Sequence, residues 1–230
     1  MSQSHVDSPD ARPTPTIEDY LTFIYVMERD GDKVIAARLA EALEVARPTV
    51  AMTLKRMERD QWITSESRKG IKLTEEGNKA ARSVIRRHML TEWVLARMLN
   101  VPWSQIHAEA HRIEHTISDE IEARMRTNLE DPQLCPHGNP LPGFEHLTAN
   151  WVPLTALKPG DGGTMRRIHE MAEDKPDLIR FLEANELLPG ARVQVVEVLP
   201  FNQTITVAVA ERQVTLGFTI ARYLFCERSG

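Results

Sequence analysis

Four of the eight histidines lie close together in the middle of the chain, and acidic residues accompany them at helical spacing. His88 and Glu92 are four residues apart, so both side chains lie on one face of a helix. A second stripe repeats every three or four residues and contains His107, His111, Glu114 and His115. Imidazole nitrogens and carboxylate oxygens suit Mn²⁺, Fe²⁺, Co²⁺, Ni²⁺ or Zn²⁺. The two groups predict a site for a divalent metal, with a purely structural histidine cluster as the alternative.

A metal held by these residues could also be hydrolytic. The run from His107 to His115 lacks the His-Glu-x-x-His arrangement, because Ala108 follows His107 and Glu109 falls on another face. The sequence contains neither a nucleophile elbow nor a Gly-rich phosphate loop. We therefore predict a metal sensor that is not an enzyme, and a metallohydrolase or a metal-storage dimer remains the competing class.

A helix–turn–helix unit with a wing is predicted ahead of the histidines. One helix spans about 36–43, and a second begins at Pro48, whose fixed φ suits the first turn of a helix. Three apolar residues share the inward face of that second helix: Val50, Leu54 and Met57. The segments 62–64 and 71–74 then predict a small hairpin with a basic tip.

The charge around this unit indicates an anionic partner. The chain has a net charge of -5, yet residues 47–87 contain eleven Lys and Arg against five Asp and Glu. The second helix of such a unit enters the major groove of double-stranded DNA, and a basic wing can reach phosphates. The residues predicted to contact DNA are Arg47, Pro48, Thr49, Met52, Thr53, Arg56, Arg68 and Lys69. A helical packing unit with a charged hairpin is the alternative.

The composition favours an intracellular protein with a buried core. The chain has 230 residues, of which 42% are hydrophobic and 27% charged, which is enough for one large domain or two to three small ones. No apolar run approaches the ~20 residues of a membrane span. The two cysteines, Cys135 and Cys226, lie too far apart for a metal-binding pair or a disulfide framework, and we expect Cys226 to be a buried core thiol. We expect a cytoplasmic location and no membrane partner.

Changes in residue pattern divide the chain. The first helix is predicted to start at an N-cap on Thr16 and to stop at Asp30, and residues 75–129 are helical in pattern with one break near 100–102. Strands are predicted at 193–198, 204–209 and 213–216, after a helix over 176–185. The predicted parts are a flexible tail (1–15), a DNA-binding domain (16–75), a helical domain (76–130), a Pro-rich linker (131–150) and a small β-barrel (151–230).

Five segments resemble the diphtheria toxin repressor family, including its manganese-responsive branch. They are TIEDYLTFIY (16–25), RPTVAMTLKRMERD (47–60), RRHMLTEWVL (86–95), HAEAHRIEHTISDEIE (107–122) and PHGNPLPG (136–143). The resemblance implies a mainly α fold with a small β domain: a winged helix–turn–helix, a helical dimerisation domain and a C-terminal SH3-like, FeoA-like barrel. It also implies a homodimeric, metal-dependent regulator that binds a palindromic operator, usually as a repressor of metal-uptake genes, and that has no small-molecule substrate.

The resemblance further implies two metal sites. Its primary site corresponds to four residues: Asp19, His111, Glu114 and His115. Its ancillary site corresponds to His88, Glu92 and His107, with two barrel residues that by position in IHEMAE are Glu170 and Glu173. We expect the remaining histidines, His5, His137, His146 and His169, to be surface residues without a role.

The metal preference follows from departures from the family pattern. Asp19 stands where the iron-responsive members have a thioether, and His111 stands where they have a thiol. Replacing soft sulfur with oxygen and nitrogen moves the site toward Mn²⁺, so Mn(II) is expected ahead of Fe(II), with Co, Ni, Zn and Cd able to substitute in vitro. The competing interpretation is a metal-independent winged-helix protein whose His/Glu cluster is structural.

Overall fold

The computed structural model describes residues 12–66 and 70–229, which form two compact units. The first unit ends at Ile85 and the second begins at Arg86, so the boundary falls within helix α4 (Glu75–Arg97). The predicted tail lies almost wholly outside the described residues, as do His5 and the basic wing-tip residues Arg68 and Lys69.

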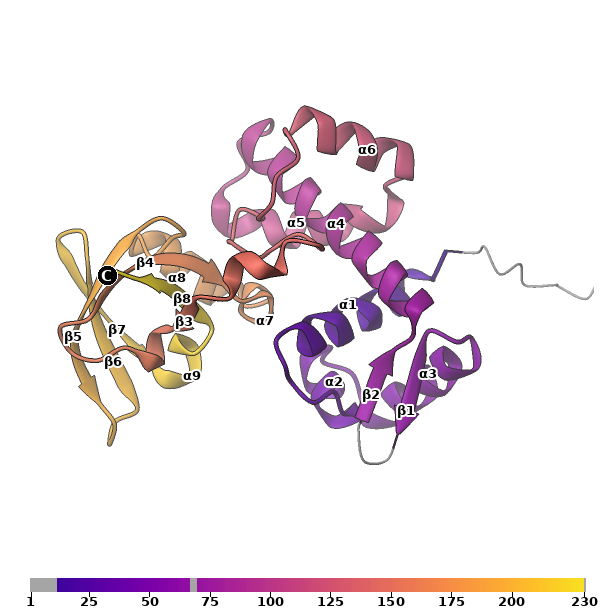
Figure 1. Ribbon diagram of the computed structural model, residues 1–230, viewed down its shortest axis with the longest axis horizontal. Coiled ribbons are helices and arrows are strands. Elements are labelled where there is room, and N and C mark those ends of the chain that lie inside the picture. The colour runs from indigo at the N-terminus through magenta and orange to yellow at the C-terminus, as the bar shows by residue number, and fades with distance from the viewer. Residues whose placement is uncertain (1–11, 67–69, 230) are drawn as a thin grey trace, which may run out of the picture. The chain divides into compact units, whose positions relative to one another are not determined.

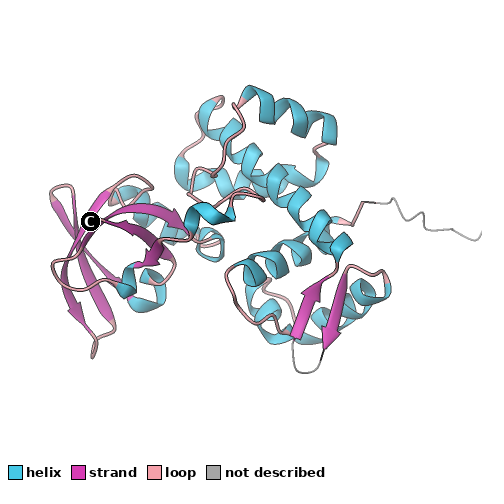
Figure 2. Ribbon diagram, viewed as in Figure 1, coloured by secondary structure: helices cyan, strands magenta, loops and turns pink. Residues whose placement is uncertain are grey.

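The described part of the first unit contains three helices and a hairpin, followed by the first part of α4 (Figures 1 and 2). Its elements are α1 (Pro15–Arg29), α2 (Ala36–Ala42), α3 (Arg47–Arg59), β1 (Ile63–Glu66) and β2 (Gly70–Leu73). The strands pair antiparallel, with Ile63 opposite Leu73. Val50, Leu54 and Met57 are buried, which confirms the predicted inward face of α3. The predicted N-cap at Thr16 is wrong: the helix begins at Pro15 with Thr14 as its N-cap, since proline is favoured in the first turn.

A hydroxyl fixes the start of α4. The Gly77 amide donates to Thr74 Oγ1 at 3.0 Å, and the Thr74 hydroxyl donates to the Gln61 carbonyl at 2.7 Å. We expect Thr74→Ala to lower the free energy of unfolding by about 1 kcal/mol, the usual cost of losing an N-cap. Urea unfolding followed by circular dichroism measures this loss. Thr74→Ser keeps the hydroxyl and serves as the control, and equal stability of the two variants would contradict the capping role.

The helical part of the second unit has the predicted break near residue 100 and a further break after Ile113 that was not predicted. After α4, a 3-10 turn at Trp103–Gln105 leads into α5 (Ile106–Ile113), a second 3-10 turn covers Glu114–Thr116, and α6 spans Asp119–Asn128. Asn100 adopts a positive φ of 53° between α4 and the first turn, near the predicted break at 100–102. The second turn matters for the site, because it rotates Glu114 and His115 out of the helical repeat of α5.

The C-terminal part of the second unit is a six-stranded antiparallel sheet. Its strand order is β3-β8-β4-β5-β6-β7. The strands are β3 (Trp151–Pro153), β4 (Gly162–Ile168), β5 (Arg192–Leu199), β6 (Thr204–Val209), β7 (Arg212–Gly217) and β8 (Leu224–Arg228). The short helices are α7 (Glu170–Glu173), α8 (Pro176–Ala184) and α9 (Phe218–Ala221), beside 3-10 turns at Glu145–Thr148 and Leu154–Ala156.

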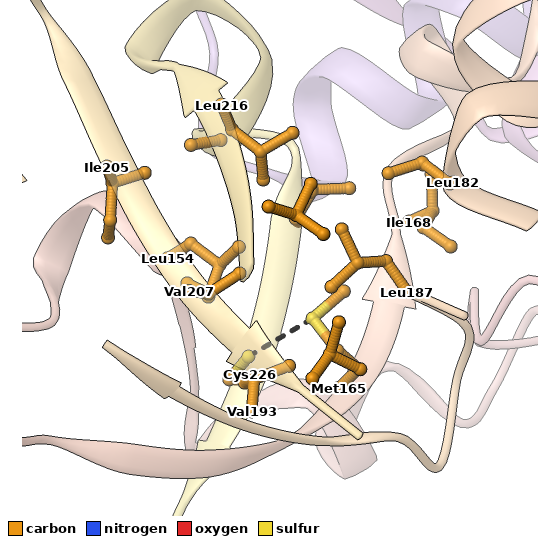
Figure 3. Close-up of a cluster of buried hydrophobic side chains, with 14 of the residues drawn as sticks. Leu154, Met165, Ile168, Leu182, Leu187, Val193, Ile205, Val207, Leu216 and Cys226 are labelled. Carbon is orange, nitrogen blue, oxygen red and sulfur yellow. Dashed lines mark hydrogen bonds between the residues drawn. The ribbon is translucent and has the colours of Figure 1, made fainter. Parts of the chain in front are cut away.

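Alternate residues of these strands make the core of the sheet domain (Figure 3). Met165, Val193, Ile205, Val207 and Leu216 point inward. Cys226 is fully buried among them, and its thiol donates to Met165 Sδ at 3.3 Å, which confirms the predicted core thiol. The strands predicted within β5, β6 and β7 are therefore confirmed, whereas β3, β4 and β8 lacked a signal strong enough to predict.

The Pro-rich segment that we expected to be a linker is packed inside the second unit. Two indole N–H groups donate to its carbonyls: Trp93 Nε1 to Leu134 at 2.7 Å and Trp103 Nε1 to Pro136 at 3.2 Å. On its other side, the Ile168 amide of β4 donates to the His137 carbonyl at 2.9 Å. Prolines remove donors but leave carbonyls, and these contacts satisfy the carbonyls.

Candidate metal centre and DNA-reading helix

One group of potential ligands lies at the end of α5. His111 Nδ1 is 3.2 Å from Glu114 Oε1, and His115 Nε2 is 3.6 Å from the same oxygen. Glu114 is buried, whereas His111 is more than half exposed. A buried carboxylate flanked by two imidazoles presents oxygen and nitrogen donors to one point, as a divalent metal requires. The structure thus brings together three of the four residues expected at the primary site; Asp19, the fourth, lies half-buried on α1 in the first unit.

A second group draws on three elements. His88 and Glu92 come from α4, His107 from α5 and Glu173 from α7, and their ligand atoms all lie within 4.8 Å of one another. Glu92 Oε1 is 3.3 Å from His88 Nε2 and 3.4 Å from His107 Nδ1. Glu173 Oε2 is 2.9 Å from His107 Nδ1. These four residues were all predicted for the ancillary site.

The structure places Glu170, the fifth residue predicted for the ancillary site, differently. Its carboxylate pairs with the Arg167 guanidinium at 3.0 Å and stands outside this group of four. His107 also departs from the predicted stripe, because it faces Glu92 and Glu173 while His111 and His115 face Glu114.

His88 touches both groups. Its Nδ1 makes a short contact with Glu114, while its Nε2 lies 3.0 Å from His107 Nδ1 and 3.3 Å from Glu92. The two groups are therefore neighbours joined by one imidazole.

Sequence reasoning missed two residues of the second group. His137 was predicted to be a surface residue but is fully buried, with Nδ1 3.2 Å from Glu92 Oε1 and 3.6 Å from Glu173 Oε2. Cys135 is buried beside it, and its ligand atom groups with those of Glu92 and His137. The sequence feature that could have indicated these two residues is the Cys-x-His spacing inside the Pro-rich segment. His169 is also buried, so its predicted surface position is wrong as well, whereas His146 is exposed as expected.

Electrostatics hold the metal-free groups together. Burial alone lowers the pKa of His88, but the carboxylates of Glu114 and Glu92 outweigh it and raise the pKa to about 10. Burial raises the pKa of Glu114, and the imidazoles of His88 and His111 overcome this effect and lower it to about 2. The same competition raises the pKa of His107 and lowers that of Glu92. The carboxylates thus favour the protonated form of these imidazoles, and the imidazoles favour the ionised form of the carboxylates.

The buried polar atoms fit a metal. Both carboxylate oxygens of Glu92 and both ring nitrogens of His137 are buried, and none of them makes a hydrogen bond of good geometry with the described residues, although Glu92 Oε1 lies 3.2 Å from His137 Nδ1. Such atoms are costly unless something completes their bonding. Their donor set is nitrogen and oxygen, and burial together with Glu92 raises the pKa of the adjacent Cys135 thiol. A protonated thiol is a poor ligand, so the set suits a hard or borderline divalent cation.

The raised histidine pKa values have a measurable consequence. A metal binds neutral imidazole, so binding at pH 7 is expected to release about one to two protons per metal from His88 and His107. The apparent affinity therefore falls as the pH drops below their pKa values. Calorimetry in two buffers that differ in ionisation enthalpy measures the released protons. Identical heats in both buffers would contradict the prediction.

Helix α3 presents its other face to solvent. Arg47, Pro48, Thr49, Met52 and Arg56 are exposed, and Met52 is 67% accessible. Thr53 is half-buried, and its hydroxyl donates to the Thr49 carbonyl at 3.0 Å. An exposed helix face next to a hairpin is the arrangement that enters a major groove.

Comparison with known proteins assigns each part of the chain. Residues 13–71 match the N-terminal DNA-binding domain of iron-dependent repressors, 74–143 their metal-binding and dimerisation domain, and 152–228 the FeoA domain. The iron-dependent repressor IdeR of Mycobacterium leprae is 36% identical over 224 residues, which cover 93% of this chain and 97% of that protein. The diphtheria toxin repressor of Corynebacterium diphtheriae is 36% identical over 172 residues, covering 75% of this chain and 73% of that protein.

Solved structures agree with this assignment. A manganese-dependent transcriptional repressor in complex with manganese superposes with a TM-score of 0.81 at 29% identity, covering 93% of this chain and all (100%) of that one. ScaR with bound Zn²⁺ superposes with a TM-score of 0.79 at 26% identity, covering 94% of this chain and 100% of that one.

The fold and the site define a metal-dependent transcriptional repressor with a DNA-binding domain and a dimerisation domain. The chain belongs to the iron-dependent repressor family, whose members include the diphtheria toxin repressors. The predicted family, three-part fold and regulatory function are confirmed. Among the described residues, no helix is both long and apolar enough to cross a membrane.

Proposed function

We propose that this chain is a cytoplasmic, homodimeric repressor of manganese or iron homeostasis genes and that Mn(II) or Fe(II) promotes its binding to a palindromic operator. The observation that carries the proposal is the pair of adjacent His/carboxylate groups, joined by His88, in a chain that also contains a DNA-binding domain. Each group contains buried carboxylates, Glu114 in the first and Glu92 with Glu173 in the second, and a buried charge is costly unless it is paired or binds a metal.

We assign the primary site to Asp19, His111, Glu114 and His115. The support is the carboxylate and imidazole chemistry of these residues and the resemblance of their segments to the family. We assign the ancillary site to His88, Glu92, His107 and Glu173, whose atoms converge in the second unit. His137 is a candidate additional ligand at the position of Glu92, whereas Glu170 pairs with Arg167.

We assign Mn(II) as the preferred metal and Fe(II) as the next. The side chains assigned to the primary site contain no sulfur, and oxygen and nitrogen donors favour manganese over softer cations. In a cell, the availability of each metal, rather than its intrinsic affinity, decides which one occupies the site. Zn²⁺ and Cu²⁺ are expected to bind the isolated protein more tightly than Mn²⁺. Selectivity for Mn²⁺ is therefore expected in how strongly each metal promotes DNA binding, and not in metal affinity alone.

The proposed mechanism is a shift in population. In the metal-free state the imidazoles are held by ion pairs to Glu92 and Glu114. The same carboxylates and imidazoles would hold a divalent metal, whose charge would take the place of the imidazolium protons. Because Asp19 belongs to the DNA-binding unit and Glu114 to the dimerisation domain, a shared metal would favour one spacing of the two recognition helices in the dimer, about 34 Å for consecutive major grooves. The effect is limited to the difference in metal affinity between the two states.

The test is DNA binding measured under three conditions. Fragments from upstream of the protein's own coding region and of metal-transporter genes are titrated with Mn²⁺, with Fe²⁺ under anaerobic conditions, and with EDTA. We expect binding with Mn²⁺, weaker binding with Fe²⁺, and loss of binding in EDTA. Equal binding in all three conditions would overturn the proposal and favour a metal-independent DNA-binding protein.

A further inference from the structure

The two oxygens of Glu173 have separate partners. Oε2 lies 2.9 Å from His107 Nδ1 and 3.6 Å from His137 Nδ1, within the second ligand group. Oε1 accepts a short hydrogen bond from the side-chain amide of Asn139. Glu173 stands at the end of a four-residue helix, which by itself gives little rigidity. The direction of its carboxylate therefore depends on Asn139.

The orientation of the Asn139 amide is determined by its neighbours. Its oxygen faces Arg167 Nε, which can only donate, so its nitrogen must face Glu173. The same nitrogen donates to the Ile168 carbonyl at 2.7 Å. Asn139 is fully buried, so water does not compete with these bonds. A flipped amide would place its oxygen against a carboxylate and a carbonyl, which is unfavourable.

Arg167 is the buried end of the chain of contacts. Its side chain is 4% exposed, its Nη2 donates to Glu170 at 3.0 Å, and its guanidinium carbon lies 5.1 Å from the centre of the Phe225 ring. Arg167 follows Arg166 on β4, but the side chain of Arg166 points to the surface and pairs with Glu227 at 2.6 Å. A buried guanidinium costs free energy unless its partners are well placed, so this position is constrained.

We propose that Asn139 and Arg167 are positioning residues that aim Glu173 at the second metal position. Arg167 fixes the amide of Asn139, and Asn139 holds Glu173 with Oε2 toward His107. The Pro-rich segment and the sheet domain thereby decide whether the second metal is retained. This inference rests on the proposed function, because it takes the second group to be a metal site.

The contact chain could instead serve only to attach the sheet domain to the helices. The two roles differ in what they change. A purely structural attachment alters the free energy of unfolding of the metal-free protein. A positioning role lowers affinity at the second metal position and leaves the first position unchanged. Outer partners of metal ligands typically contribute 10- to 100-fold to affinity.

The experiment measures Mn²⁺ binding to the full chain by calorimetry and by the electron paramagnetic resonance signal of free Mn²⁺. We expect two Mn²⁺ per protomer in the unmodified protein. Asn139→Ala and Arg167→Met should each weaken the second binding event about 10- to 100-fold, with the first event unchanged. Arg166→Met is the matched control, because it removes a guanidinium from the preceding residue of the same strand. This variant should bind both metal ions with unchanged affinity.

Two further variants make the outcome decisive. Glu173→Gln should reproduce the loss, and the double variant Asn139→Ala/Glu173→Gln should lose no more than Glu173→Gln alone. Additive losses, or normal second binding in Asn139→Ala, would overturn the inference. Asn139→Ser provides the same test if the alanine or methionine variant fails to fold, as judged by urea unfolding without metal. Absence of Mn²⁺ binding in the unmodified protein would instead overturn the proposed function.

Discussion

Replacing Glu114 with glutamine is expected to abolish most of the metal response. Glu114 contacts three imidazoles, those of His88, His111 and His115, and its pKa is lowered to about 2, so it carries a charge at every physiological pH. Glutamine keeps the shape but removes the charge. We expect operator affinity at saturating Mn²⁺ to fall roughly 5- to 150-fold, the range of a typical allosteric coupling.

The measurement is a gel shift or fluorescence anisotropy titration with and without Mn²⁺. Glu109→Gln is the matched control, because Glu109 lies on α5, the helix that leads into Glu114, but pairs with Arg112 at 2.7 Å at the surface. Asp19→Ala should behave like Glu114→Gln if the assigned primary site is correct. Operator affinity equal to that of the unmodified protein in both Asp19→Ala and Glu114→Gln would contradict the mechanism.

Replacing Gly138 with alanine is expected to be the most destabilising single change in the Pro-rich segment. Gly138 has a φ of 88°, and an added Cβ would lie 1.8 Å from the backbone oxygen of Arg166 and 2.8 Å from its carbonyl carbon. Both neighbours are backbone atoms of β4, so a side-chain rotation cannot relieve the clash. The left-handed conformation alone costs about 1–2 kcal/mol for alanine. With the clash added, we expect a loss of more than about 3 kcal/mol in the free energy of unfolding.

Gly160 offers a matched control within the same unit. Its φ is 91°, but nothing lies within 4 Å of the Cβ that alanine would add. Gly160→Ala should therefore lose only the conformational part, about 1–2 kcal/mol. Urea unfolding of both variants separates the cost of the left-handed backbone conformation from the cost of the clash with β4. Equal losses would show that the close approach of the Pro-rich segment to β4 is not maintained in solution.

The predictable part of this protein is the part governed by local periodicity. The inward face of α3 was predicted because an apolar residue every three or four positions defines a helix face. His88 and Glu92 were placed together for the same reason, since four residues make about one turn. The donor types of the metal groups, and hence the chemistry of the site, could also be read from the sequence.

The remaining features depend on tertiary packing. His137 and Asn139 lie in a segment without periodicity, and only the approach of β4 on one side and of two indoles on the other buries them. The predicted stripe from His107 to His115 assumed one continuous helix, but α5 ends at Ile113 and a 3-10 turn follows. Strand β4 contains Gly162, Gly163 and two arginines, so its residue pattern gave no signal although its Met165 and Ile168 are in the core.

The docked Pro-rich segment also bears on how tightly the second ligand group can hold a cation. A carboxylate on a freely tethered domain would be available at an effective concentration set by the tether, on the order of millimolar for a short flexible one. Glu173 lies on α7, and its carboxylate is instead held by Asn139 of the Pro-rich segment, which two indoles and a strand fix in place. If Glu173 binds a cation as proposed, the entropy of ordering its carboxylate would therefore be lost during folding and not at the moment of binding.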